Sequence, residues 1–295
     1  MAEKQWDGTT YGNGLMHRWL IGILRRIDVR CVYVFAYVFV IPPCLFRPGF
    51  KFIYRYFRQR FGDSPLKAFW HTYLNHCLFA EAVIDKFAMY AGKKFDVEIE
   101  GYDHFLRLAA QEPGFVQLSS HTGNYEIAGY TLVAETKHIN AIVYFGEKAT
   151  VMNNRMRMFS HTNIGMIPIR EDMSHLFEID RALSNGEIMS IPGDRIWGSQ
   201  KALKAELLGK EARFPMGPYT VAAMRGLDVL AVNVMKVAWT RYKIYVTPLQ
   251  YDKEAPRKRQ IDQLLHAYLA ELERLIKLYP TQCFIIYLLS HKENS

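Results

Sequence analysis

The chain has 295 residues, of which half are hydrophobic and 14% aromatic, enough to form a large buried core. This composition excludes an extensively disordered protein. The net charge is +8, and residues 1–60 carry most of it, with ten Lys or Arg against three Asp or Glu. The remaining 235 residues are nearly neutral. They lack the basic clusters that a nucleic-acid enzyme places beside its chemistry, so we expect no nucleic-acid partner.

Cysteine and histidine usage limits the possible metal sites and cross-links. The four cysteines at positions 31, 44, 77 and 283 form no Cys-x-x-Cys pair. Their spacing argues against a disulfide framework and against structural zinc. The ten histidines form no HExxH or HxxEH pattern. We therefore predict neither a metal ion nor another cofactor.

A hydrophobic segment near the N-terminus suggests contact with a membrane. Residues 31–46 are sixteen uncharged, mostly apolar residues flanked on both sides by arginines. As a helix they would reach about 24 Å, short of a hydrocarbon core of roughly 30 Å. Pro42 and Pro43 would break this helix near its end. A monotopic or re-entrant helix, a single span and a buried core helix all remain open, and the basic flanks favour both ends facing the cytoplasm.

The rest of the chain alternates between two kinds of apolar pattern. Helical spacing predicts a helical hairpin or one long helix over residues 64–91, and further helices over 173–184 and 257–278. Short apolar runs predict strands at 114–120, 139–145, 165–169, 187–191, 229–237 and 242–249. This alternation predicts an α/β fold with a largely parallel central sheet flanked by helices. We expect a membrane-associating segment over residues 1–60, followed by one α/β domain with a helical lead-in over 61–295.

The most informative stretch is FVQLSSHTGNYE at residues 115–126, where polar residues follow an apolar strand. In open α/β sheets, ligands bind at the carboxyl ends of strands. We expect Glu126 to hydrogen-bond one imidazole nitrogen of His121, which leaves the other nitrogen to act as a general base. Gly123 would let a substrate approach the backbone, and Asn124 would cap the following helix.

Polar residues also follow the next apolar strands. Arg170 ends one strand candidate, and the Pro-Gly-Asp-Arg turn at 192–195 follows another. Arginines at such a rim can bind phosphate or stabilise an oxyanion. The substrate-binding residues that we predict around this composite rim are Gly123, Asn124, Arg170, Gly193, Asp194 and Arg195.

The residues from His121 to Glu126 resemble the HxxxxD/E motif of the glycerolipid and lysophospholipid acyltransferases. The HxGN(W/Y)E wording is closest to the bacterial late lipid A (lauroyl or myristoyl) acyltransferase branch. Three later blocks are similar to that superfamily in order and spacing: GMIPIR at 165–170, PGDR at 192–195 and FPMGP at 214–218. Tyr125 replaces the commoner tryptophan, and Asp-Arg at 194–195 replaces the Asp-Gln of many lipid A enzymes. These departures leave the acceptor lipid open.

The resemblance implies transfer of a fatty acyl chain from a thioester to a hydroxyl or amine of a membrane lipid. The donor would be acyl carrier protein or acyl-CoA. His121 would be the base, Glu126 its orienting partner, and the cytoplasmic face of the bacterial inner membrane the location, with the N-terminal segment monotopic or single-span. Two rival functions stay open: a non-catalytic module that binds acyl chains or carrier protein, and a thioesterase-like hydrolase that uses the same base on water.

Overall fold

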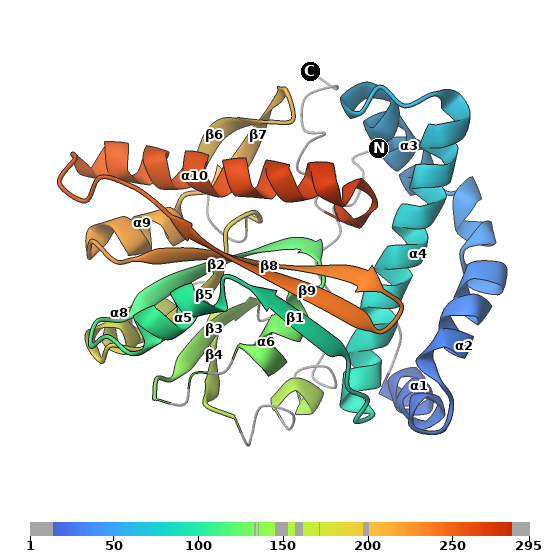
Figure 1. The fold of residues 1–295 in the computed structure, drawn as a ribbon, viewed down its shortest axis with the longest axis horizontal. Coiled ribbons are helices and arrows are strands. Elements are labelled where there is room, and N and C mark those ends of the chain that lie inside the picture. Colours follow the sequence, from blue (N-terminus) through green and yellow to red (C-terminus); the bar gives the residue numbers. More distant parts are fainter. Residues whose placement is uncertain are drawn as a thin grey trace.

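The computed structural model describes residues 14–132, 134, 136–144, 153–156, 162–170, 172–196 and 201–284 (Figure 1). Its helices are α1 (Gly14–Arg26), α2 (Val29–Phe35), α3 (Pro48–Arg60), α4 (Pro65–Tyr90), α5 (Tyr102–Ala109), α6 (Ala128–Thr131), α8 (His175–Ser184), α9 (Gly217–Met224) and α10 (Arg257–Leu278). Its strands are β1 (Asp96–Glu100), β2 (Phe115–Gly123), β3 (Ile139–Tyr144), β4 (Ile164–Ile169), β5 (Ile188–Pro192), β6 (Ala202–Leu207), β7 (Lys210–Pro215), β8 (Val229–Ala238) and β9 (Arg241–Leu249). Short 3-10 or π-helical segments are η1 (Ala36–Val40), η2 (Pro42–Phe46), η3 (Tyr125–Ile127) and η4 (Pro280–Gln282).

Seven of the strands form one mixed sheet in the order β1-β9-β8-β2-β5-β3-β4. The central strand β2 pairs in parallel with both β5 and β8, and β3 pairs in parallel with β5 and β4. Strand β9 returns antiparallel to β8, and β1 is parallel to β9. The predicted α/β fold with a largely parallel sheet is confirmed.

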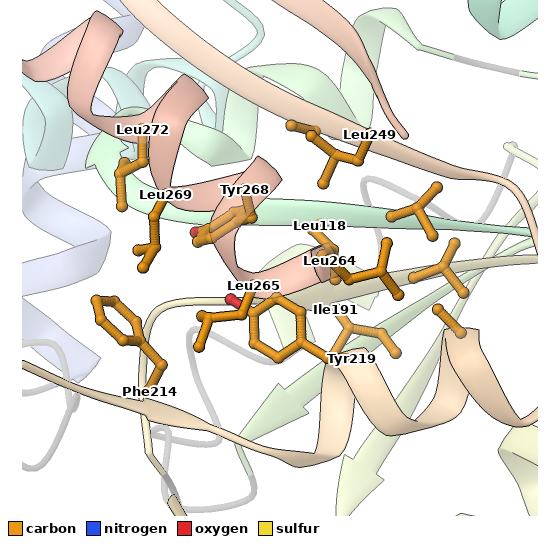
Figure 2. Packing of buried hydrophobic residues seen from close by; sticks show 14 of the residues in the cluster. Leu118, Ile191, Phe214, Tyr219, Leu249, Leu264, Leu265, Tyr268, Leu269 and Leu272 are labelled. Atoms are coloured by element: carbon orange, nitrogen blue, oxygen red, sulfur yellow. The ribbon is translucent and has the colours of Figure 1, made fainter. Parts of the chain in front are cut away.

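The sheet is covered by helices on both faces, and alternate residues of β2 serve the two sides. Val116 and Leu118 belong to a core cluster shared with α8, α9 and α10, whereas Phe115 belongs to a second cluster shared with α5. Figure 2 shows Leu118 of β2 and Ile191 of β5 packed among residues of α9 and α10. Strands buried on both faces are apolar almost throughout, which explains why short apolar runs revealed them.

The sequence predicted most of the long elements. All six predicted strands are present with shifted ends, and β2 runs on to Gly123; Phe145, the last residue of the second predicted strand, lies outside the described residues. The stretch 64–91 is one long helix, α4, rather than a hairpin, and α10 has the predicted bounds. The pattern missed β1 and the separate β6–β7 hairpin.

The apolar N-terminal segment is a continuous but irregular helix from Val29 to Phe46. It passes from α-helix through the π-helical η1 to the 3-10 segment η2, which begins with the two prolines. A proline lacks an N–H and its ring displaces the carbonyl four residues earlier, so the preceding turn widens. With a mean hydropathy of 1.9 and 22% of the segment buried, this is the one helix, within the described ranges, that is long and apolar enough to cross a membrane.

Not all of residues 1–60 stand apart from the domain. Ile53, Tyr56 and Phe57 of α3 lie in the same core cluster as α9 and α10. Helices α1 and α2 pack with α4 in a smaller cluster beside the sheet, where Figure 1 shows them outside α4. Any truncation that tests membrane contact must therefore spare α3.

A buried network of charged and phenolic groups ties α2 and α4 to the sheet. The ammonium of Lys236, on β8, lies 2.5 Å from a Glu81 carboxylate oxygen and 2.7 Å from one of Asp85, both on α4. Tyr33 of α2 and Tyr242 of β9 both donate hydrogen bonds to Asp85. All five side chains are buried. Charges removed from water are tolerated when they are paired and hydrogen-bonded in this way, so the network fixes α2 and α4 against the ends of β8 and β9.

Candidate active site

An irregularity in β2 presents the HTGNYE motif at the carboxyl end of this central strand. Ser119 pairs with Val232 of β8, but Gly123 pairs with Val234, so β2 uses four residues where β8 uses two. Such bulges bend a strand and redirect its side chains. The hydroxyl of Ser120 turns inward and donates to Asn233 at 2.6 Å. His121, next along the bulge, lines a cavity.

The carboxylate beside His121 comes from a neighbouring strand. Asp194 follows β5, which pairs in parallel with β2, so the two strands end at the same edge. Nδ1 of His121 lies 2.8 Å from one carboxylate oxygen of Asp194, and the backbone N–H of His121 donates to the other at 2.5 Å. A carboxylate oxygen accepts, so Nδ1 carries the proton and Nε2 is the basic nitrogen. Asp194 is fully buried and holds the ring in one orientation.

Two tyrosines hold the two segments that meet here, the turn that carries Asp194 and the end of β2. The hydroxyl of Tyr219 donates to the carbonyl of Gly193 at 2.7 Å, and that of Tyr268 donates to the carbonyl of Ser119 at 3.0 Å. The two rings are packed together among leucines of α10 (Figure 2). A Cβ at Gly193 would lie 2.9 Å from the Tyr268 ring, so only glycine fits there. Burial first, and then the nearby Asp194 charge, raise the pKa of both phenols, which stay neutral donors.

No hydrogen bond joins Glu126 to His121, although the structure describes both side chains. One of its carboxylate oxygens lies 2.9 Å from the Lys86 ammonium of α4 and 2.5 Å from Nη2 of Arg155. The predicted hydrogen bond between Glu126 and His121 is therefore wrong, because Asp194 holds Nδ1 and Glu126 faces two cations. Burial would raise the pKa of Glu126, but the charges of Arg155 and Lys86 outweigh burial and lower that pKa to about 2.

These groups meet at a cavity of about 320 Å³. His121, Tyr125, Glu126, Arg155 and Arg195 supply much of its polar lining. The rest of the wall is largely aliphatic and comes from the region of α6, β3, β4 and α8: Leu132, Ile139, Ile142, Ile164, Met166, Ile169, Leu176 and Ile179. An apolar cavity with a few convergent polar groups at one side is typical of a binding site for a small, mostly apolar ligand.

Comparison with known proteins gives the family. The family model described as "Bacterial lipid A biosynthesis acyltransferase" matches residues 82–289, which include the bulge, both neighbours of β2 and the cavity. The chain belongs to this acyltransferase family. The crystal structure of the 1-acyl-sn-glycerophosphate acyltransferase PlsC from Thermotoga maritima is similar over 89% of this chain and 98% of that chain, at 16% sequence identity and a TM-score of 0.39. No curated protein matches the chain.

Within this acyltransferase, the two glycines and the asparagine predicted to contact substrate are also closely packed against the protein itself. A Cβ at Gly123, which has φ +70°, would lie 1.9 Å from the carbonyl oxygen of Val234. A glycine at this position therefore lets the backbone of β8 lie close to β2. The Asn124 amide donates to the hydroxyl of Tyr242 at 3.2 Å and makes no cap to η3. Gly193 is packed beneath Tyr268. The predicted helix cap by Asn124 is therefore wrong, and the substrate contacts expected of these three residues stay predictions.

The two arginines differ in where they lie. Arg195 lines the cavity, so its role in substrate binding stays a prediction. Arg170 lies outside the lining, exposed and paired with Glu178 of α8, and its role also stays a prediction. Asp194 is fully buried against His121, and the substrate contact expected of it stays a prediction.

Arg155 is the residue that the sequence reasoning missed. It lies in a helical turn, 153–156, where no long apolar pattern marks an element. Its guanidinium is nearly buried, and although burial lowers its pKa, Glu126 outweighs that effect and raises it above its usual range. It enters the cavity as a permanent cation.

The Glu126 contacts predict a specific loss of stability in acid. Its folded-state pKa of about 2 lies below the usual 4.5, so the stabilisation is complete above pH 4.5 and is lost as the pH falls toward 2. The difference corresponds to about 3 kcal/mol. We expect the unfolding free energy of Glu126→Gln to fall less steeply than that of the parent protein over this range in urea titrations. Equal slopes would contradict the pairing.

Proposed function

We propose that this family member transfers a fatty acyl chain from an acyl thioester, carried by acyl carrier protein or CoA, to a hydroxyl or amine of a membrane lipid. One observation carries the proposal: His121, with Nδ1 held by buried Asp194, lies in the wall of an aliphatic cavity. The cavity suits an acyl chain, and the second imidazole nitrogen suits proton transfer at its reactive end.

The reaction follows from the arrangement. Nε2 of His121 takes the proton from the acceptor as the acceptor oxygen or nitrogen attacks the thioester carbonyl carbon. The carbonyl electron pair moves to its oxygen, and this tetrahedral intermediate then collapses with cleavage of the C–S bond. His121 returns the proton to the departing thiolate. Asp194 stabilises the imidazolium that forms in between, so no covalent acyl-enzyme is needed.

Competing functions predict different products from the same assay. Purified protein would be given acyl carrier protein and CoA thioesters together with bacterial membrane lipids, with thiol release followed and the lipids analysed by mass spectrometry. We expect thiol release matched by a newly acylated lipid. Release of free fatty acid alone would indicate a hydrolase, and no thiol release with either donor would favour a binding module.

We further propose that the segment from Val29 to Phe46 lies on the membrane instead of crossing it, at the cytoplasmic face of the bacterial inner membrane. Tyr33 donates to buried Asp85, and the hydroxyl of Tyr73 on α4 donates to the carbonyl of Tyr37 at 3.1 Å. These contacts hold one side of the helix against the protein, while Phe35, Phe39 and Phe46 are exposed on the other. An apolar face beside arginines is typical of an interfacial helix.

The exposed phenylalanines give a direct test of this membrane contact. Replacing Phe39 and Phe46 together by aspartate should lower partitioning onto anionic liposomes by at least about tenfold, because each buried phenylalanine contributes about 1.5–3 kcal/mol. Flotation measures the bound fraction. The matched control replaces Leu106 of α5 and Leu278 of α10, which are also exposed, by aspartate. Equal flotation of the two double variants would contradict the proposed face.

A further inference from the structure

Glu126, the carboxylate of the HTGNYE motif, does not orient His121 but holds two cations. Glu126 joins Lys86 of α4 to Arg155, and its side chain is 9% exposed. A carboxylate that keeps its charge in such a place fixes the cation next to it, because separating the pair would leave a buried charge unpaired. The cation that lines the cavity is Arg155.

Arg155 and His121 face the same space. Both line the cavity, and so does Tyr125, whose ring centre lies 5.2 Å from that of the His121 ring. Nη2 of Arg155 is held 2.5 Å from a Glu126 carboxylate oxygen, so the cation is fixed where it lines the cavity. A fixed positive charge therefore lines the same cavity as the base, on a side chain that is about 11% exposed to solvent.

We propose that Arg155 is a catalytic residue that stabilises the negative charge on the thioester carbonyl oxygen, and that Glu126 is the positioning residue that aims it. The inference rests on the proposed acyl transfer. Glu126 then contributes to stabilising the oxyanion, through Arg155. Asp194 orients the general base, His121.

The chemistry requires such a group. When the acceptor attacks, the carbonyl oxygen takes the electron pair of the C=O double bond and becomes an oxyanion, while His121 holds the acceptor's proton. A guanidinium carries a permanent positive charge and a planar set of N–H donors, which suit a developing oxyanion. Held in advance in an apolar wall, such a cation stabilises charge more strongly than water does, and it needs no rearrangement as the charge develops.

Kinetic parameters of Arg155 variants test the assignment. We expect Arg155→Gln to lower kcat by about 10²–10³-fold while KM for the acyl thioester changes little, because the interaction forms mainly in the transition state. Arg155→Lys should recover part of kcat, since it keeps the charge. Arg225→Gln, which removes an exposed arginine paired with Asp180 at the end of α9, is the matched control and should keep the parent kcat.

A double variant tests the positioning role of Glu126. If Glu126 acts through Arg155, Glu126→Gln lowers kcat in the parent protein but causes little further loss in the Arg155→Gln background. If the losses of kcat in the two single variants multiply in the double variant, Glu126 does not act through Arg155. A parent-like kcat for Arg155→Gln would overturn the catalytic role of Arg155. Thermal unfolding of each variant separates these outcomes from misfolding, and Arg155→Lys supplies a second variant if Arg155→Gln is unstable. Failure of the parent protein to transfer acyl groups would refute the proposed function itself.

Discussion

Replacing His121 by alanine should lower kcat for acyl transfer by about 10²–10⁴-fold, the usual contribution of a positioned general base. The variant loses the nitrogen that takes the acceptor's proton and returns it to the thiolate. It keeps the backbone N–H that donates to Asp194, and the imidazole itself is partly exposed in the cavity wall. We therefore expect its unfolding temperature to stay close to that of the parent.

The matched control for this substitution is His266→Ala. His266 lies on the exposed side of α10, where Nδ1 donates to the carbonyl of Asp262 on its own helix. This control should keep full activity in the thiol-release assay. A correctly folded His121→Ala protein that turns over at the parent rate would contradict the mechanism.

Replacing Lys236 by methionine should lower the free energy of unfolding by about 3–5 kcal/mol, because it leaves two buried carboxylates without their cation. Glu81 and Asp85 both depend on that ammonium. Burial raises the pKa of both carboxyl groups, and Lys236 opposes the rise. Without the lysine the folded protein gains more from protonating these groups, so the deficit should shrink as the pH is lowered.

Lys243→Met is the matched control for the buried lysine. Lys243 lies on the neighbouring strand β9 and pairs with Glu98 and Glu100, both largely exposed. Exposed pairs contribute at most about 1 kcal/mol, so this variant should unfold nearly like the parent in urea. Equal losses in the two variants would show that the buried network adds nothing specific to stability.

The layout of the sheet could be predicted because its information is local. The buried strands are mostly apolar, as in β8, and α10 repeats its apolar residues at helical spacing from end to end. Strand β1 gives no apolar run, because its few apolar residues alternate with exposed charged ones. Strands β6 and β7 also mix apolar with charged residues.

The site was only partly predictable, because its key contacts join distant segments. His121 was identified from the strand end that carries it. The choice between Glu126 and Asp194 as its partner depends on β5 lying beside β2, which local spacing cannot show. The Gly-Asp turn after a strand was the available signal, and it was assigned to substrate. No sequence motif marks Arg155 as a site residue, since its place in the site depends on Glu126 and on the surrounding cavity.

The catalytic arrangement is tested most directly by the kcat of Asp194→Asn in the acyl-transfer assay. We expect a loss of about 10²–10⁴-fold, because an amide can still accept the backbone N–H of His121 but no longer fixes the protonated Nδ1 or stabilises the imidazolium. A parent-like kcat in a correctly folded Asp194→Asn protein would contradict a catalytic pair of Asp194 and His121.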